Sequence, residues 1–132
     1  KNITWYGPSG CGQHAKLANQ IMQAGIMSGV CEALSYVKEK GLDPEVFMEG
    51  AAAGAGQNAL LQAYGPRIVK GDLDPGFFIA FFIKDLKLAY DSAAESGLVL
   101  DSLANTVSHY EKLSEEGLGR LGMQALMKYY EK

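Results

Sequence analysis

The sequence predicts one all-helical domain, a bundle built around a single long helix, and three observations support this class. First, a chain of 132 residues is long enough for one hydrophobic core, and its 48% apolar and 20% charged residues exclude a disordered protein. Second, a helical pattern runs without interruption from Gly12 to Lys40. Third, glycine and proline divide the rest into helical segments, and only residues 2–6 alternate in the way typical of a strand.

The long helix is expected to stop at Gly41, with Lys38 and Lys40 near the negative end of its dipole. Its second half is apolar on nearly every side, through Ile26, Met27, Val30, Leu34 and Val37. Because a helix that is apolar all round is usually buried, we expect it to form the axis of the domain. A stripe of small residues would let a neighbouring helix approach closely: Ala18, Gly25, Gly29 and Ala33.

The shorter helices are predicted from their start and stop signals. Asp-Pro pairs at 43–44 and 74–75 place a capping residue before proline at the first helical position. Glycine-rich breaks at 54–56, 65–66, 97 and 117–119 separate the segments. We therefore expect helices over residues 44–53, 57–64, 77–96 and 101–116, and a last one that ends at Tyr130.

Composition excludes several functions. A net charge of −3 offers no basic surface for nucleic acid, and no apolar run reaches the roughly 20 residues that cross a membrane. Cys11 and Cys31 would lie about 30 Å apart on one helix, too far for a disulfide, so reduced thiols and a cytoplasmic location are expected. His14 and His109 have no nearby ligand partner in sequence, so we expect both to be structural and predict no metal site.

Polar side chains gather at the start of the long helix. Gln13, Lys16, Asn19, Gln20 and Gln23 occupy one sector of about 120°. The positive helix end behind a glycine-rich turn suits an anion, so a substrate carboxylate could bind there with Lys16 as general acid. The alternative is that Lys16 simply extends into water beside exposed amides.

At this point the residues match a known pattern. The segment Gly10-Cys11-Gly12-Gln13-His14-Ala15-Lys16-Leu17-Ala18-Asn19-Gln20 resembles the G-x-G-x-x-x-K-x-x-N motif of the β-hydroxyacid dehydrogenases. That family includes 3-hydroxyisobutyrate dehydrogenase, tartronate semialdehyde (2-hydroxy-3-oxopropionate) reductase, and succinic semialdehyde and glyoxylate reductases. Blocks at 65–67, 71–73, 75–77 and 84–89 are similar to later family blocks and follow in the same order. The resemblance covers essentially the whole chain.

The resemblance implies a two-domain enzyme of which this chain is the second part. In the family, a Rossmann domain precedes a helical domain, and a long interdomain helix joins them. Residues 9–132 would be the helical domain for substrate binding and dimerisation, and residues 1–8 a remnant of the preceding domain, with Ile3–Tyr6 as its last strand. The intact protein would interconvert a short 3-hydroxy acid and its semialdehyde with NAD or NADP, and the isolated domain would be inactive. A homo-oligomer is expected.

The resemblance also assigns roles to single residues. Lys16 matches the family lysine that gives a proton to the carbonyl oxygen and takes it back in the reverse reaction. Gly12 and Asn19 would help to bind substrate, and Gln20 stands where many relatives have a second Asn. Lys84 is similar to a lysine that reaches the cofactor, and Asp91 follows on the same helix face. Most of the cofactor would be bound by the preceding domain.

Alternative functions stay open at this point. A reductase of tartronate semialdehyde, succinic semialdehyde or glyoxylate fits the same motifs. The chain could also be a non-catalytic helical assembly module or a ligand-binding relative. The sequence departs from the family pattern at Gln57-Asn58, where relatives often carry Ser, and at 120–124, where acidic residues and a Ser are common. Both departures concern the substrate rather than the fold.

Overall fold

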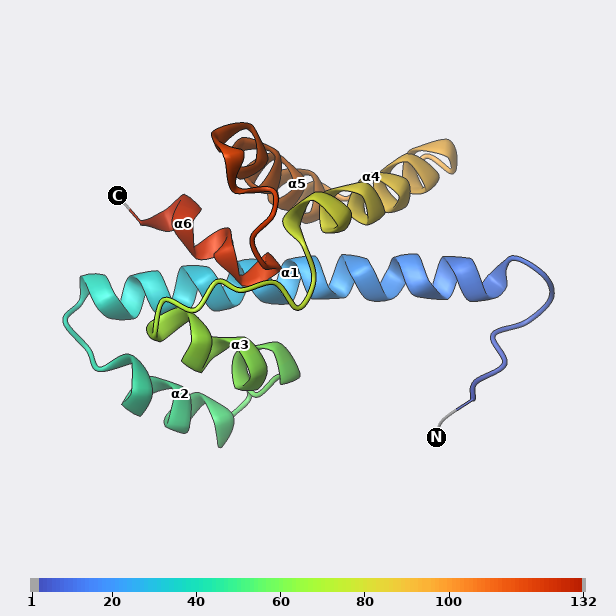
Figure 1. Ribbon diagram of the computed structural model, residues 1–132. Coiled ribbons are helices and arrows are strands. Elements are labelled where there is room, and N and C mark those ends of the chain that lie inside the picture. The colour runs from blue at the N-terminus through green and yellow to red at the C-terminus, as the bar shows by residue number, and fades with distance from the viewer. Residues whose placement is uncertain (1–2, 132) are drawn as a thin grey trace.

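The computed structural model describes residues 3–131 as a helical bundle around one long helix, α1 (Cys11–Glu39). Figure 1 shows the helices between residues 44 and 69 on one side of α1 and those between residues 79 and 130 on the other. The remaining α-helices are α2 (Pro44–Ala52), α3 (Ala59–Val69), α4 (Ile79–Glu95), α5 (Asp101–Leu113) and α6 (Met127–Tyr130). A π-helical turn (Ser114–Leu118) and a 3₁₀ turn (Met123–Leu126) connect α5 to α6. The all-helical prediction is confirmed.

The ends of α1 follow from local backbone chemistry. Gly10 precedes the helix with a φ of 95°, and its carbonyl accepts bonds from the N–H groups of Gln13 and His14. At the other end, Gly41 has a φ of 69°, and the N–H of Leu42 donates to Val37. This is the left-handed stop that glycine provides without a steric penalty. The helix predicted from Gly12 to Lys40 therefore forms over Cys11–Glu39.

The core lies between α1, α4 and α5. Met27 and Leu34 of α1 are fully buried, as are Phe82 and Leu86 of α4 and Tyr110 of α5. The rings of Phe82 and Tyr110 meet edge to face at 5.3 Å, and the Tyr110 hydroxyl donates to the Met123 carbonyl. Burial of these large side chains supplies most of the hydrophobic driving force of the domain. No helix within residues 3–131 is long and apolar enough to cross a membrane.

The prediction that the second half of α1 is buried on nearly every side is wrong. Ile26 and Tyr36 are 37% and 63% exposed. Gly25 and Gly29, which were expected under a neighbouring helix, are exposed, and a Cβ on either would meet nothing within 4 Å. Neighbouring helices flank α1 but leave this face open. The apolar composition of α1 does not show which of its faces the neighbouring helices leave uncovered.

The expected N-terminal strand is absent from residues 3–6. Ile3, Trp5 and Tyr6 are exposed, and no described segment pairs with them. A strand needs hydrogen bonds to a neighbour, and alternation in sequence cannot supply one. The predicted strand also includes Asn2, which lies outside the described residues. The one β-bridge among residues 3–131 is an isolated contact between Phe78 and Gly122.

The third helix does not stop before Gly65-Pro66 as predicted but continues to Val69. Gly65 is buried against α2, where a Cβ would come within 2.6 Å of the Met48 sulfur. Glycine at this position therefore lets α3 pack closely against α2. The residues around Gly65 in the sequence do not predict this long-range contact. Ile68 is 3% exposed and packs in the core, so its burial anchors the last turn of α3 after Pro66.

Two other boundaries differ from the predictions. Asp74-Pro75 does not cap α4, which begins at Ile79 after Phe78 and has no side-chain cap. Helix α5 ends at Leu113 and passes into the π-helical turn instead of continuing to Glu116. The start of α4 is fixed by distant partners, since the Ile79 N–H donates to the Leu121 carbonyl and the Ala80 N–H to the Gly119 carbonyl.

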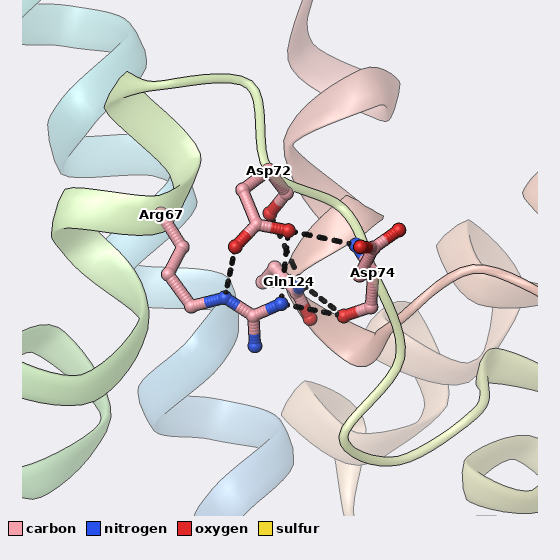
Figure 2. A network of polar contacts seen from close by, with 4 residues as sticks. All are labelled: Arg67, Asp72, Asp74 and Gln124. Atoms are coloured by element: carbon pink, nitrogen blue, oxygen red, sulfur yellow. Dashed lines mark hydrogen bonds and ion pairs between the residues drawn. The ribbon is translucent and has the colours of Figure 1, made fainter.

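The loop before α4 is held by a network of four residues, shown in Figure 2. The Arg67 guanidinium donates to both oxygens of Asp72, at 2.7 and 3.0 Å, and to the Asp74 carbonyl at 2.7 Å. The Gln124 amide, fully buried, donates to the carbonyls of Asp72 and Asp74 at 3.2 and 3.0 Å. The network ties α3, the loop and the 3₁₀ turn together.

Candidate active site

The polar start of α1 meets α4 at one carboxylate, that of Asp85. Its Oδ2 lies 3.6 Å from the Lys16 ammonium and accepts a 3.0 Å hydrogen bond from the Gln20 amide. Its Oδ1 lies 3.0 Å from the Lys84 ammonium. We call Lys16, Gln20, Lys84 and Asp85 the two-lysine cluster. It brings together three residues predicted for the site and a fourth, Asp85, for which the sequence suggested no role.

Asp85 is 5% exposed, so its charge needs compensation. Burial alone would raise the pKa of this carboxyl. The hydrogen bonds from Lys84 and Gln20 and the positive charge of Lys16 outweigh burial, and the pKa is lowered from its usual value. Asp85 is therefore an anion at neutral pH and holds the two ammonium groups on opposite oxygens.

Both lysines remain open to solvent beyond this contact. The side chains of Lys16 and Lys84 are 59% and 65% exposed. Two ammonium groups against one carboxylate leave one net positive charge at the surface. Each ammonium has three donors, so both can bind a further anion while they stay on Asp85. The arrangement suits a carboxylate or phosphate group and a proton donor beside it.

The two amides after Lys16 differ in their surroundings. Gln20 is 7% exposed. Besides donating to Asp85, it accepts a hydrogen bond at its Oε1 from the Gln23 amide at 3.0 Å, and this second bond fixes its orientation. Asn19 is exposed, and its side chain makes no hydrogen bond to any of residues 3–131. Gln20 therefore belongs to the two-lysine cluster, whereas Asn19 lies beside it with its amide free for a ligand.

The other two predicted site residues lie outside the cluster. Gly12 is exposed in the first turn of α1, where a Cβ would meet nothing within 4 Å, so the surface above it is open. Asp91 is exposed on α4, about 9 Å along the axis from Asp85. It lines a different pocket with Lys87 and Glu111, which form a 2.8 Å ion pair. The structure does not bring Asp91 to Lys84.

Two of the residues at the departures from the family motifs have clear structural roles. Asn58 is the N-cap of α3, and its Oδ1 accepts from the Leu61 N–H at 2.7 Å. Gln124 belongs to the network in Figure 2. Among residues 3–131, no group of three or more His, Cys, Asp or Glu side chains is placed to hold a metal ion.

Comparison with known proteins gives the family. The family model described as the NAD-binding domain of NADP-dependent 3-hydroxyisobutyrate dehydrogenase matches residues 10–130. The chain belongs to this family. The membership confirms the resemblance on which the residue assignments rest.

Curated relatives have related names. The chain is 42% identical over 125 residues to a probable 3-hydroxyisobutyrate dehydrogenase-like mitochondrial protein of Arabidopsis thaliana, covering 95% of this chain and 37% of that protein. It is 35% identical over 131 residues to the 2-hydroxy-3-oxopropionate reductase of Escherichia coli, covering 99% of this chain and 45% of the reductase. The chain thus spans less than half the length of these relatives.

Solved structures show the same fold. The 3-hydroxyisobutyrate dehydrogenase of Salmonella typhimurium aligns with a TM-score of 0.90 at 23% identity, over 97% of this chain and 45% of that one. The Mycobacterium tuberculosis enzyme, in a structure titled with L-serine, aligns with a TM-score of 0.91 at 23% identity. It covers 99% of this chain and 47% of the solved chain.

Proposed function

We propose that this chain is the helical part of an NAD(P)-dependent oxidoreductase that interconverts a short 3-hydroxy acid and its semialdehyde. The observation that carries the proposal is the two-lysine cluster, in which Asp85 holds Lys16 and Lys84 with their ammonium groups exposed. Membership in the dehydrogenase family supports the reaction class.

Lys16 is the proposed acid and base. In reduction, its ammonium group gives a proton to the carbonyl oxygen, while a bound nicotinamide cofactor supplies the hydride to the carbonyl carbon. In oxidation, the neutral amine takes the hydroxyl proton. Asp85 acts through Lys16 as a positioning residue, because its ion pair keeps the flexible lysine on the face of α1 that also carries Gln20.

Binding is assigned to the groups around the cluster. The surface above Gly12 and the free amide of Asn19 would receive the substrate, with the Lys16 ammonium beside its carboxylate. Gln20, held by its hydrogen bond to Asp85, would help to position the substrate or Lys16. Lys84 would meet an anionic part of NAD or NADP, a role its 65% exposed side chain allows. The cofactor role of Asp91 stays a prediction, and its exposed side chain lines the pocket with Lys87 and Glu111 rather than the two-lysine cluster.

A second domain is needed to complete this site. The described residues form no parallel sheet that could cradle a dinucleotide, so they can contact only part of the cofactor. Exposed apolar side chains stand beside Lys84 on α4, with Phe81 at 56% and Leu88 at 53%. We propose that a preceding Rossmann domain covers them, that the protein is a homo-oligomer, and that the 132-residue chain alone is inactive. A covering domain would also explain why α4 carries exposed apolar side chains at this place.

One other substrate has specific support. The E. coli relative is named a 2-hydroxy-3-oxopropionate reductase and is 35% identical to this chain. A reductase of that semialdehyde would use the same Lys16 chemistry, and assays of both substrates with both cofactors would decide between them. Succinic semialdehyde and glyoxylate belong in the same screen.

The test is Lys16→Ala in the protein with its cofactor-binding domain. Loss of a general acid typically lowers turnover about 10²–10⁴-fold, so we expect kcat to fall in that range. Lys38→Ala is the matched control, since Lys38 is an exposed lysine on the same helix whose nearest acid, Glu131, is 4.0 Å away. Near-normal turnover of Lys16→Ala would contradict the proposal.

A further inference from the structure

A second polar site lies between α1 and α5, away from the two-lysine cluster. It is a pocket of about 490 Å³, to which α1 contributes Gly25, Ser28 and Glu32, and α5 contributes Ser102, Asn105 and His109. Glu32 is 16 residues beyond Lys16, or about 24 Å along the helix. None of the proposed chemistry uses these residues.

The Tyr130 hydroxyl organises one wall of this pocket. It lies 3.2 Å from the Ser28 hydroxyl, 3.2 Å from Glu32 Oε1 and 3.3 Å from His109 Nδ1. A tyrosine hydroxyl has one proton, and an ionised carboxylate can only accept. Tyr130 therefore donates to Glu32 and accepts from Ser28 and from the Nδ1–H of His109. This assignment satisfies all three contacts at once.

The assignment leaves acceptors for a ligand. With Nδ1 protonated, the neutral His109 ring keeps Nε2 as an acceptor. Burial lowers the pKa of His109, the nearby Glu32 charge raises it and Lys112 lowers it, with a net decrease that favours the neutral ring. Glu32 forms no ion pair within residues 3–131, and it has a second oxygen besides the one that Tyr130 contacts.

The rest of the pocket is polar and accessible. The side chains of Ser102 and Asn105 make no hydrogen bond to any described residue, so the hydroxyl and the amide are free. Gly25 forms part of the α1 wall, and the space where its side chain would stand is empty to 4 Å. A small ligand can therefore approach the α1 backbone directly.

We propose that this pocket binds the ammonium group of a small organic amine. The one uncompensated charge that lines it is the Glu32 carboxylate, and the Tyr130 network leaves Glu32 and His109 as acceptors. An ammonium group supplies three donors and the opposite charge. The free Ser102 hydroxyl and Asn105 amide would bind other polar atoms of the same ligand.

The test is a titration of the chain with 1,4-diaminobutane, followed by NMR and calorimetry, with butane-1,4-diol as the uncharged analogue. We expect saturable binding of the diamine, no binding of the diol, and shifts at His109 and Asn105. Glu32→Gln should weaken binding at least about tenfold, a loss of about 1.4 kcal/mol. Gly25→Leu should abolish it by filling the pocket. Glu39→Gln, an exposed glutamate on the same helix, should bind normally.

Several results would overturn the proposal. Absence of saturable diamine binding by the unmutated chain would do so, as would equal affinity in Glu32→Gln. A dimer in sedimentation experiments that Gly25→Leu dissociates, without any diamine binding, would show that a second copy occupies the pocket instead. Because the readout is binding, it is independent of the reaction proposed for Lys16.

Discussion

Two aspartates of this domain are each held by cations, but they serve different ends. Asp72 receives both of its cation contacts from one guanidinium, that of Arg67, in a forked pair at 2.7 and 3.0 Å. Asp85 lies between two separate ammonium groups, at 3.6 and 3.0 Å. In the first network the donors are taken up by protein acceptors, because Arg67 also donates to the Asp74 carbonyl. The second leaves ammonium donors directed to solvent.

The difference is the reason why we propose a structural role for the first pair and a ligand-binding role for the second. The guanidinium of Arg67 is fixed by three bonds, and Gln124 closes the same loop from a fully buried position. Among the described residues, Lys16 and Lys84 form ion pairs only with Asp85, and their side chains are exposed. Donors that are held by protein acceptors stabilise the fold, whereas donors without a protein partner are free to bind a ligand.

Gln124→Ala should cause the largest loss of stability. It removes a fully buried side chain with its two part-buried hydrogen bonds to the carbonyls of Asp72 and Asp74, and it leaves a cavity. We expect the free energy of unfolding to fall by about 2–4 kcal/mol. Urea denaturation measures it, with the exposed Gln62→Ala as control. A change below about 0.5 kcal/mol would mean that the loop is held by other contacts.

Acid should weaken the Asp72 network next. The hydrogen bond from Arg67, followed by the Asp74 backbone N–H, lowers the pKa of Asp72 from 3.8 to about 2. A carboxyl with a lowered folded-state pKa stabilises the fold above its unfolded-state value, and this contribution is lost as pH falls from about 4 toward 2. Asp72→Asn should flatten this part of a stability curve measured by denaturation. An unchanged slope would contradict the assignment.

The smallest effects on stability are expected at the two-lysine cluster. Lys16→Met and Lys84→Met each remove an ammonium group with an exposed side chain, and one lysine remains on Asp85 in each case. We expect the free energy of unfolding to change by no more than about 0.5–1 kcal/mol. A loss as large as that of Gln124→Ala would show that the cluster is structural and would remove the contrast between the two networks.

Much of the fold could be predicted from local signals. The length of α1, the Asp43-Pro44 start of α2 and the left-handed glycine after α1 are encoded within a few residues of each boundary. The errors occur where distant segments decide. Gly65 packs against α2, the start of α4 is bonded to residues 119–121, and the strand expected at residues 3–6 has no partner among the described residues.

The candidate site shows the same division. Lys16 could be found from its place in the helix and from the family motif, and the spacing placed Gln20 on the same face. Asp85 was missed as the centre because its partner Gln20 is 65 residues away. The one local signal was that an acidic residue directly follows Lys84. In many sequences such a neighbouring pair is only an ion pair at the surface. His109 was expected to lack a carboxylate partner, and Glu32 reaches it only through Tyr130.

The most direct test of the two-lysine cluster is Asp85→Asn in the protein with its cofactor-binding domain. The amide keeps the size of the side chain but removes the charge that holds Lys16 and Lys84. We expect kcat to fall at least about tenfold, because the charge that holds the Lys16 ammonium group in place is gone. The unfolding midpoint should stay near that of the unmutated protein. Normal kcat would contradict a functional role for the cluster.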